Sequence, residues 1–366
     1  MIALLVGAGI SLAFTLVVTP FFANLLRNLR LGQLIRQDTP TTHEVKRGTP
    51  GMGGVVFIVG SIVGYFAGTW IGGQTPTMAA ALVLLMMGGL GLVGFLDDFL
   101  KVRRQNSAGL RGWYKIAGAA LVAAVFALIG LFWKDENGYS PVSSALSGIR
   151  DTDWDAVKAF GVVGGTIVIV AWVALITVAT SNAVNLTDGL DGLASGASIF
   201  ALGSYIVIGF WQFQQSCASP QLLAENAAKC YEVSNPLDLA AAAACIAGSL
   251  IGFLWWNTSP ARIFMGDSGS LALGGALAAL AVQTRTELLL IVIGGLFIIV
   301  AGSVIVQIGV WRLSRRRVRL LQASPLHHHF EMKGWAEITI VVRFWLISAL
   351  CAAAGVGLFY LEWLQR

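Results

Sequence analysis

The sequence contains few charged residues. Only 12% of its 366 residues are Asp, Glu, Lys or Arg, whereas 56% are apolar. Soluble domains carry roughly twice this charged fraction, so the composition excludes an ordinary soluble protein and indicates an all-α polytopic membrane protein. The formal net charge of +5 need not indicate a nucleic-acid partner, and none is expected.

Cysteine is also scarce, and the familiar patterns of nucleophilic catalysis are missing. The chain has four cysteines, and no pair of them has the spacing of a zinc site. Cys217 and Cys230 share one segment, where oxidising surroundings would permit a disulfide; the alternative is two free thiols. No Ser-His or Cys-His arrangement stands out, and no carboxylate pair suggests a glycosidase. The N-terminus lacks the basic region and cleavage site of a removable signal peptide, so we expect the first apolar run to remain as a span.

The sequence contains long apolar runs with few charged residues. Stretches of about 17–25 apolar residues can cross a bilayer as helices, and we expect ten of them in one integral-membrane domain, residues 1–366. The eighth is short and rich in Gly and Ala, which weakens its signal. The expected spans cover about 2–26, 53–72, 78–96, 113–133, 159–180, 193–212, 238–256, 269–283, 288–311 and 338–362.

The loops between these runs divide by charge. Basic residues gather between the first and second spans, after the third and after the ninth, whereas the alternate loops hold mainly acidic residues. Basic loops stay in the cytoplasm under the positive-inside rule, so we expect both termini outside and five cytoplasmic loops. The Asn, Asp and His clusters fall almost entirely in these five loops, which cover roughly 27–52, 97–112, 181–192, 257–268 and 312–337.

A pair of adjacent carboxylates closes the third span. Asp97 and Asp98 end an almost uncharged run, and Lys101 follows them by four and three residues. Such carboxylates are costly at the end of a membrane helix unless a cation meets them, and on a helix Lys101 can reach either one. The pair could hold Mg²⁺, which prefers carboxylate oxygens, or one member could act as a base or a nucleophile. The plainer alternative is a helix cap at the membrane interface.

Polar clusters in the other cytoplasmic loops suit a phosphate-bearing ligand. In the first loop, basic residues precede Gly-rich backbone, whose N–H groups can approach a phosphate. The fourth loop places Asp267 at the mouth of a helix and offers Phe264 to stack on a base. The fifth loop holds three consecutive histidines, which can donate to phosphate oxygens or carry protons. Each cluster alone also fits a polar turn, a basic membrane anchor or interfacial packing. The stretches concerned are 43–54, 182–193, 257–270 and 324–331.

These clusters gather at one face of the membrane. Acidic residues for a metal, basic residues and histidines for phosphates, and an aromatic for a base predict phosphoryl transfer onto a molecule dissolved in the membrane. Such chemistry depends on positioning and on neutralising charge. A secondary transporter is the alternative from another class, but transporters place their polar groups near the bilayer midplane. We therefore favour an interfacial enzyme.

Taken together, the motifs resemble those of the polyprenyl-phosphate N-acetylhexosamine-1-phosphate transferases, and within them the phospho-N-acetylmuramoyl-pentapeptide transferases. The resemblance extends over essentially the whole chain. The three consecutive histidines favour this branch over enzymes that transfer N-acetylglucosamine-1-phosphate for other glycan lipids. Gly51 stands where members often have another residue, a minor departure. The motifs are Lys46-Arg47-Gly48-Thr49-Pro50, Met52-Gly53-Gly54, Asp97-Asp98-Phe99-Leu100-Lys101, 182–191, Phe264-Met265-Gly266-Asp267 and His327-His328-His329.

The resemblance implies a Mg²⁺-dependent step of peptidoglycan synthesis at the bacterial inner membrane, with a cytoplasmic active site. UDP-N-acetylmuramoyl-pentapeptide and undecaprenyl phosphate would give undecaprenyl-diphospho-muramoyl-pentapeptide (lipid I) and UMP. Either the lipid phosphate attacks the β-phosphorus directly, or an aspartate attacks first and a phospho-enzyme forms. We favour direct attack, because lipid phosphate is already a charged nucleophile. A homodimer is a further expectation from the resemblance.

The resemblance also implies roles for individual residues. Asp97 and Asp267 are the expected metal ligands, and Asp98 or Asp97 would deprotonate or orient the lipid phosphate, with His327 as a further catalytic residue. Contacts with phosphates or the sugar are expected at Lys46, Thr49, Asn185, His327 and His328. The uridine pocket is expected to comprise Gly189, Leu190, Asp191, Asn257, Phe264 and Gln307. Further substrate contacts are expected at Lys101, Lys115, Asn182, Asp188 and His329.

Overall fold

The computed structural model describes residues 1–29, 48–104, 109–219 and 229–366. Lys46, which we expected to contact phosphate, lies outside the described residues. Long helices make up most of the described chain, and one short hairpin accompanies them. The elements are α1 (Ile2–Asn28), α2 (Gly54–Ile71), α3 (Met78–Arg103), α4 (Gly112–Phe132), β1 (Ala145–Ser147), β2 (Asp151–Asp155), α5 (Ala156–Thr187), α6 (Leu193–Gln214), α8 (Pro236–Asn257), α9 (Gly266–Gln283), α10 (Leu289–Ile293), α11 (Gly295–Leu313), α12 (Leu326–Met332) and α13 (Glu337–Gln365).

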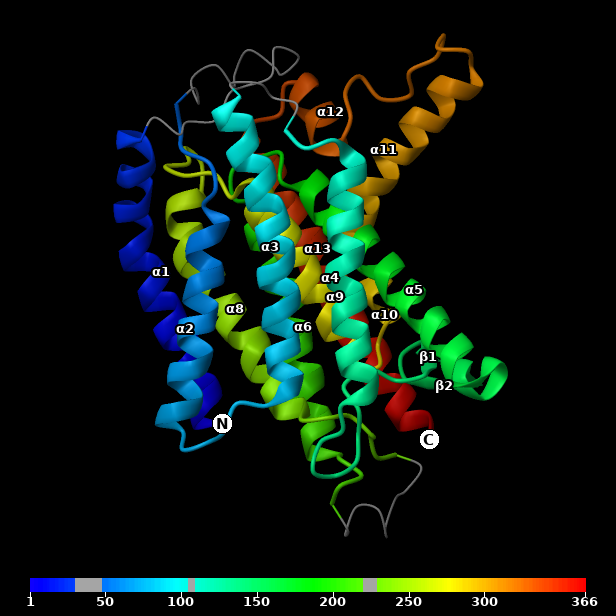
Figure 1. Cartoon of the computed structure of the whole chain (residues 1–366). Helices are drawn as coiled ribbons and strands as arrows, with labels where there is room; N and C mark the ends of the chain where they lie inside the picture. The colour runs from blue at the N-terminus through cyan, green and yellow to red at the C-terminus, as the bar shows by residue number, and fades with distance from the viewer. Residues whose placement is uncertain (30–47, 105–108, 220–228) are drawn as a thin grey trace.

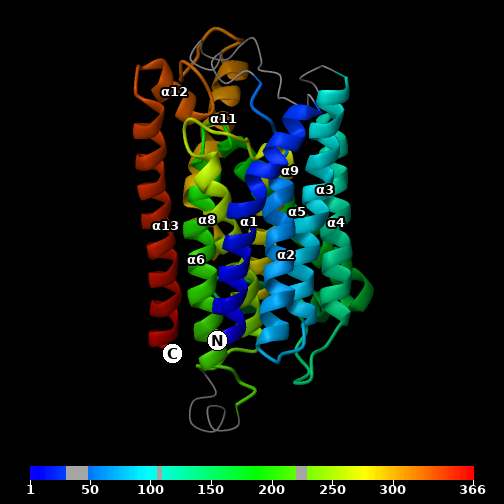
Figure 2. The same cartoon turned by 90° about the vertical axis from the view of Figure 1, so that its left-hand side faces the viewer.

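The long helices run side by side as a bundle (Figures 1 and 2). In the described part of the chain, nine helices are long and apolar enough to cross a membrane. The chain is therefore a multi-pass membrane protein, as its composition predicted. Both termini lie at one end of the bundle and α12 lies at the other (Figure 2), as an even number of spans requires.

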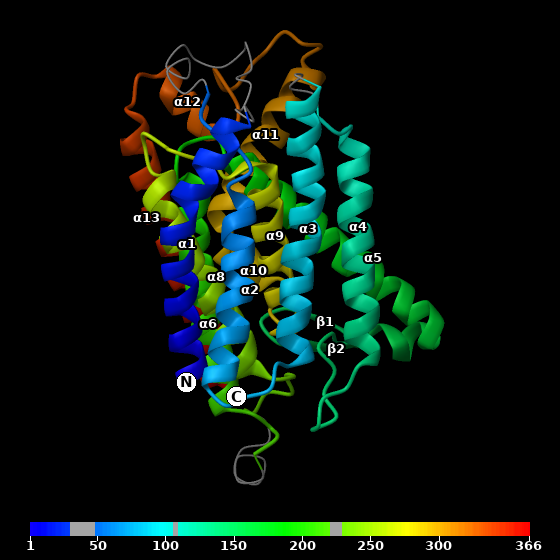
Figure 3. The ribbon, with the colours of Figure 1, turned by 60° about the vertical axis from the view of Figure 1, so that its left-hand side comes forward.

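The eighth expected span corresponds to α9, which lies inside the bundle (Figure 3). It packs against α2, α3 and α5, and every residue of Gly266–Gln283 except Asp267 is buried. Its many Gly, Ala and Ser residues let neighbouring backbones approach closely. Because protein rather than lipid surrounds α9, it can span the bundle with fewer large apolar side chains. Its weak apolar signal in the sequence follows from this position.

The ninth expected span is a correction, because it is not one helix. The structure divides it at Gly294 into the short α10 and the longer α11, and α11 leans away from the bundle (Figure 1). Two consecutive glycines, Gly294 and Gly295, stand at the break, and glycines commonly mark sharp changes of helix direction. The Leu313 end of α11 therefore stands apart from the neighbouring helices.

Two loops are also more ordered than the sequence indicated. The segment 134–158, expected to lie outside the cytoplasm, contains the antiparallel hairpin β1–β2, a small exception to the all-α prediction. The expected inner loop 181–192 begins within a helix, because α5 extends to Thr187. Asn182 and Asn185 consequently project from the last turns of α5 and have directions fixed by that helix.

A disulfide joins Cys217 and Cys230, which confirms the pairing considered from the sequence. The bond closes the segment between α6 and α8, at the end of the bundle that carries the chain termini (Figure 1). Arg150, in the β1–β2 turn, donates to Cys230 O (2.7 Å) and lies over the Tyr231 ring at 3.9 Å. The hairpin and the disulfide segment thus support one another.

Candidate active site

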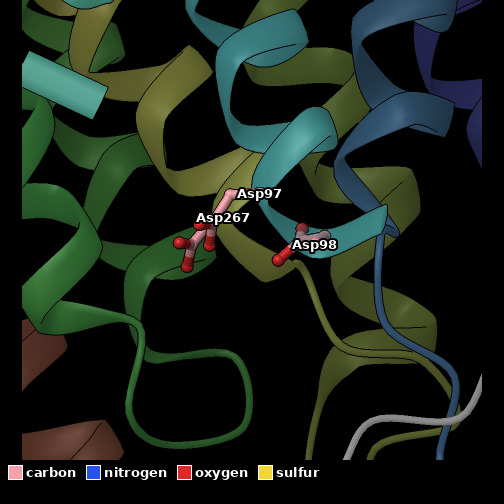
Figure 4. Close-up of side chains that lie close together, drawn as sticks. All are labelled: Asp97, Asp98 and Asp267. Atoms are coloured by element: carbon pink, nitrogen blue, oxygen red, sulfur yellow. The ribbon is translucent and has the colours of Figure 1, made fainter. Parts of the chain in front are cut away.

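Three carboxyl groups meet at the end of the bundle opposite the chain termini. Asp97 and Asp98 lie near the end of α3 and Asp267 lies in the first turn of α9, and Figure 4 shows their side chains gathered between these helices. One oxygen from each residue lies within 4.8 Å of the others. Asp97 is fully buried and Asp98 is 6% exposed. Water therefore screens these charges little, and they need partners within the protein.

A glycine contact brings the two helices close enough for this meeting. A Cβ atom at Gly94 would lie 2.0 Å from Asp267 O and 2.6 Å from Ser268 N, so no larger residue fits at this crossing. Asp97 follows Gly94 by three residues and therefore lies about one turn further along the same face of α3. The crossing thus sets the distance between the carboxylates of the two helices.

Asp98 also supports the start of α9. Its Oδ2 atom accepts a hydrogen bond from the backbone N–H of Ser268 at 3.0 Å. The first N–H groups of a helix have no partner within the helix, and the helix dipole favours a negative charge beside them. Asp98 is therefore a cap, as the plainer alternative held, but it caps a different helix from its own.

Two lysines share the carboxylates. Lys101 Nζ lies 2.6 Å from Asp97 Oδ2, 3.1 Å from Asp267 Oδ2 and 3.5 Å from Asp98 Oδ1. Lys115, on α4, places its Nζ 2.9 Å from Asp97 Oδ2 and 2.5 Å from Asp267 Oδ2. The helical spacing predicted the contacts of Lys101 with its own helix. The position of Lys115 depends on how α4 packs and was not evident from the sequence.

A second glycine contact brings α5 to the site. A Cβ atom at Gly274 would lie 2.3 Å from Ser181 Cα, so α5 and α9 touch at this point. One turn further along α5, Asn185 Nδ2 donates to Asp267 Oδ1 (2.9 Å) and to Ser270 Oγ (2.8 Å). Asn185 therefore orients the Asp267 carboxylate through the oxygen that the lysines do not contact.

Asp188 follows directly after α5 and lies near enough to the cluster for the charges of Asp267 and Asp98 to act on it. Burial raises the pKa of the Asp188 carboxyl well above its ordinary value, and the nearby charges of Asp267 and Asp98 raise it further. Both effects penalise the charged form. Asp188 is thus biased toward the neutral acid, which can donate a hydrogen bond.

The segment expected to form a uridine pocket is tied to other parts of the chain. Asp191 donates its N–H to Glu337 Oε1 (3.0 Å), and its Oδ2 accepts from Ala261 N (3.1 Å). Asn257 accepts from Ser195 Oγ (2.8 Å) and donates to a backbone carbonyl of the following loop (3.0 Å). Asp191 and Asn257 consequently shape the two loops, and Leu190 beside them is buried.

The histidine run brings one ring into the protein interior. His327 is fully buried, and a Cβ atom at Gly189 would lie only 2.2 Å from its Nε2. His328 Nδ1 lies 2.5 Å from Glu331 Oε2, and His329 Nδ1 accepts from Gln322 N at 3.1 Å. His327 therefore lies against the segment after α5, whereas His328 and His329 have contacts that stabilise α12 and the loop before it.

The remaining expected site residues lie in varied surroundings. Gln307 uses both amide atoms on the backbone of Leu321, accepting at 2.8 Å and donating at 3.4 Å. Asn182 is exposed, and its amide donates to its own helix at 2.8 Å. Phe264 and Thr49 are half-buried neighbours, because the residue after Thr49 accepts from Phe264 N at 2.9 Å.

Ser270 and Glu337 are positioning residues that sequence reasoning missed. Ser270 shares the Asn185 amide with Asp267, and its spacing of three residues from Asp267 on a helix could have indicated a common face. Glu337 lies in the first turn of α13, where an acid is common near the positive end of a helix. Nothing in the sequence indicated that it would accept from the Asp191 N–H.

The carboxylates fit a divalent cation. Asp97 Oδ2 and Asp267 Oδ2 face a common point, since both approach the same two ammonium groups. Mg²⁺ prefers oxygen ligands and retains several waters, so that one or two carboxylates suffice to hold it. Asp98 directs Oδ2 to Ser268 and leaves Oδ1 toward the cluster. Asp97 and Asp267 are thus the ligand pair that the geometry favours.

Comparison with known proteins shows the family of the chain. Residues 79–285 match the family described as glycosyl transferase family 4. Phospho-N-acetylmuramoyl-pentapeptide-transferase of Clavibacter sepedonicus is 57% identical over 372 residues, covering 100% of both chains. The proteins of the same name from Streptomyces avermitilis and Beutenbergia cavernae are 50% and 49% identical over 363 residues, covering 99% of each chain. The family match, together with the membrane-spanning helices, identifies a membrane-embedded glycosyl transferase. The chain belongs to the phospho-N-acetylmuramoyl-pentapeptide-transferase family.

Proposed function

We propose that the protein transfers phospho-N-acetylmuramoyl-pentapeptide from its UDP-activated form to undecaprenyl phosphate, giving lipid I and UMP. The observation that carries the proposal is the cluster of Asp97, Asp98 and Asp267 with two lysines at one end of a membrane bundle. Carboxylates can hold a metal ion, and ammonium groups beside them can bind phosphate oxygens, so this cluster suits a diphosphate with its metal ion. The full-length similarity to the named transferases favours the muramoyl-pentapeptide substrate over N-acetylglucosamine.

We propose that Mg²⁺ is the metal, held by Asp97 and Asp267. When bound, it would supply positive charge to the diphosphate and to the UMP leaving group. The residues of the chain supply the rest: Asn185 orients Asp267, and Asp98 fixes the start of α9. Lys101 adds a positive charge beside the same oxygens.

The membrane setting supports a lipid acceptor. The apolar side chains of α11 are strongly exposed, with Ile305 at 71% and Leu313 at 87%, and α5 beside α11 exposes Leu175 at 60%. A polyprenyl tail can lie along these surfaces while its phosphate reaches the end of the bundle. With basic loops inside, this end faces the cytoplasm, and the disulfide lies at the outer end, where oxidation is possible.

Direct attack remains the mechanism that we propose. An oxygen of the lipid phosphate forms a bond to the β-phosphorus, the bond between this phosphorus and the bridging oxygen breaks, and UMP leaves with the electron pair. Asp97 and Asp98 would orient the lipid phosphate, and their proximity to Asp267 supports this role. A labelled phospho-enzyme, trapped from the UDP substrate in the absence of lipid, would instead require an aspartate nucleophile.

The test is a transfer assay with the purified protein in detergent. It contains undecaprenyl phosphate, Mg²⁺ and either UDP-N-acetylmuramoyl-pentapeptide or UDP-N-acetylglucosamine, and UMP release is followed. We expect release with the first substrate only, with loss of release in Asp267→Asn and after addition of EDTA. Release with the second substrate only would move the protein to the glycan-lipid branch. Release with neither, from a folded protein, would overturn the proposed function and favour transport, which vesicle uptake would reveal.

A further inference from the structure

The two ammonium groups of the site occupy the same pair of carboxylate oxygens. Lys101 Nζ lies 2.6 Å from Asp97 Oδ2 and 3.1 Å from Asp267 Oδ2. Lys115 Nζ lies 2.9 Å and 2.5 Å from the same two atoms. These oxygens are also the ones that face the point where a metal ion would bind. Two lysines and a metal ion therefore depend on one pair of ligand atoms.

Simultaneous binding of a metal ion and both lysine ammonium groups to these two carboxylate oxygens is unfavourable. Mg²⁺ binds oxygens at about 2.1 Å, so an ion on Asp97 Oδ2 and Asp267 Oδ2 would lie beside both ammonium groups in surroundings that screen charge poorly. Three carboxylates with two ammonium groups leave one net negative charge. Addition of a divalent cation would reverse this sign, whereas departure of one ammonium group would restore neutrality.

Lys115 is the lysine that can leave. Lys101 belongs to α3 together with Asp97 and Asp98, and its additional contact with Asp98 Oδ1 at 3.5 Å retains it. Within the described residues, the ion pairs of Lys115 are confined to Asp97 and Asp267. Lys115 lies in the first turn of α4, and its side chain is 24% exposed. A rotation about its flexible stem would move the ammonium group away without moving a helix.

We propose that Lys115 is a resident cation that holds Asp97 and Asp267 together until the metal ion displaces it, after which its ammonium group binds a phosphate of the substrate. The inference rests on the proposed function, because it takes the divalent cation to be the one that the reaction uses. It assigns to Lys115 a second role besides substrate binding. Binding of the metal ion would then also release Lys115 to bind phosphate.

The first experiment measures Mn²⁺ binding as a probe of the site. Free Mn²⁺ is counted by electron paramagnetic resonance with the unaltered protein and with Lys115→Met, both in detergent without substrate, and Mg²⁺ is used as a competitor. Because the variant lacks a cation that competes for the ligands, we expect its Kd for Mn²⁺ to be about tenfold lower. We also expect its melting temperature in EDTA to be lower and its stabilisation by Mn²⁺ to be larger.

Arg111→Met is the matched control. Arg111 immediately precedes α4, is exposed, and forms no ion pair with a described residue. Its replacement removes the same charge from the residue after Leu110, whose N–H donates to Asp97 Oδ1 at 2.6 Å. A Kd change within about twofold would therefore separate direct competition from the general field of the protein. Equal or weaker Mn²⁺ binding by Lys115→Met, an equal gain in Arg111→Met, or no Mn²⁺ binding by the unaltered protein would each overturn the inference. A positive transfer assay together with any of these results leaves the proposed function intact.

A second measurement needs no variant. Acetylation of Lys115 by N-hydroxysuccinimide acetate is followed by mass spectrometry, with and without Mg²⁺. The internal standard is exposed Lys158, in the first turn of α5 and at the opposite end of that helix from Asn185. We expect Mg²⁺ to raise the rate at Lys115 severalfold and to leave Lys158 unaffected. A rate at Lys115 that is unchanged or lower with Mg²⁺ would overturn the displacement.

Discussion

Replacement of Gly94 by alanine tests whether the crossing of α3 and α9 sets the geometry of the site. The added Cβ atom would lie 2.0 Å from Asp267 O and 2.4 Å from Asp267 C, whereas ordinary contacts begin at 3.4 Å. Both obstructing atoms belong to the backbone, so no side chain can rotate away. The helices must therefore separate by about 1.4 Å at this point, and Asp267 must move away from Asp97 by a similar distance.

A displacement of this size is large for catalysis. Misplacement of reacting groups by about 1 Å can cost on the order of a hundredfold in rate, which corresponds to about 3 kcal/mol in the activation free energy. We therefore expect Gly94→Ala to lower kcat for UMP release about a hundredfold. The KM for the UDP substrate should change less, because Asp191, in the segment expected to bind uridine, is held by hydrogen bonds with Glu337 and Ala261 that do not involve this crossing.

Gly88→Ala is the matched control on the same helix. A Cβ atom at Gly88 meets no other atom within 4 Å, and alanine favours a helix over glycine by up to about 1 kcal/mol. We expect this variant to keep its activity and to melt at the same or a slightly higher temperature. If Gly94→Ala is as active as Gly88→Ala, then the position of Asp267 does not depend on this contact, and the reasoning from close approach is refuted.

Two further predictions concern other parts of the molecule. Asn185→Leu removes the donor to Asp267 Oδ1. Because a hydrogen bond to a charged group contributes about 1.5–3 kcal/mol, we expect kcat to fall at least about tenfold in a variant whose melting temperature shows that it is folded. An unchanged kcat would contradict this role of Asn185. At the opposite end, burial raises the pKa of the Glu287 carboxyl to about 7 from 4.5. Its ionisation is therefore harder in the folded protein, and stability should fall as pH rises through this window, by about 3 kcal/mol in total at 1.36 kcal/mol per pKa unit. Melting temperatures between pH 5 and pH 8 should decrease more steeply for the unaltered protein than for Glu287→Gln, and equal slopes for the two proteins would argue against a buried titrating Glu287.

The sequence predicted those parts of the fold that follow from composition and local spacing. Apolar runs marked the lipid-facing helices because a membrane span must be apolar along its whole length. The spacing of Asp97, Asp98 and Lys101 predicted their contacts because all three lie on one helix. The break at Gly294 was missed, because two glycines within an apolar run fit a continuous span as well as a bent one.

The parts of the site that depend on contacts between helices distant in the sequence could not be predicted from the sequence. Lys115 reaches Asp97 only because α4 packs beside α3, and no local pattern specifies that distance. The partnership of Glu337 with the Asp191 N–H depends in the same way on the position of α13. Sequence motifs therefore named several members of the site, whereas the close approaches at Gly94 and Gly274 decided which of them meet.

The enclosed position of α9 has a consequence for how the chain enters the membrane. This helix does not meet the apolarity of the nine described helices that qualify as spans, and it begins with the charged Asp267. A segment of this composition gains little by partitioning into lipid alone. We expect α9 to insert only together with α8 and the earlier helices, so that assembly of the bundle, and not the affinity of α9 for lipid, brings Asp267 to its position in the membrane.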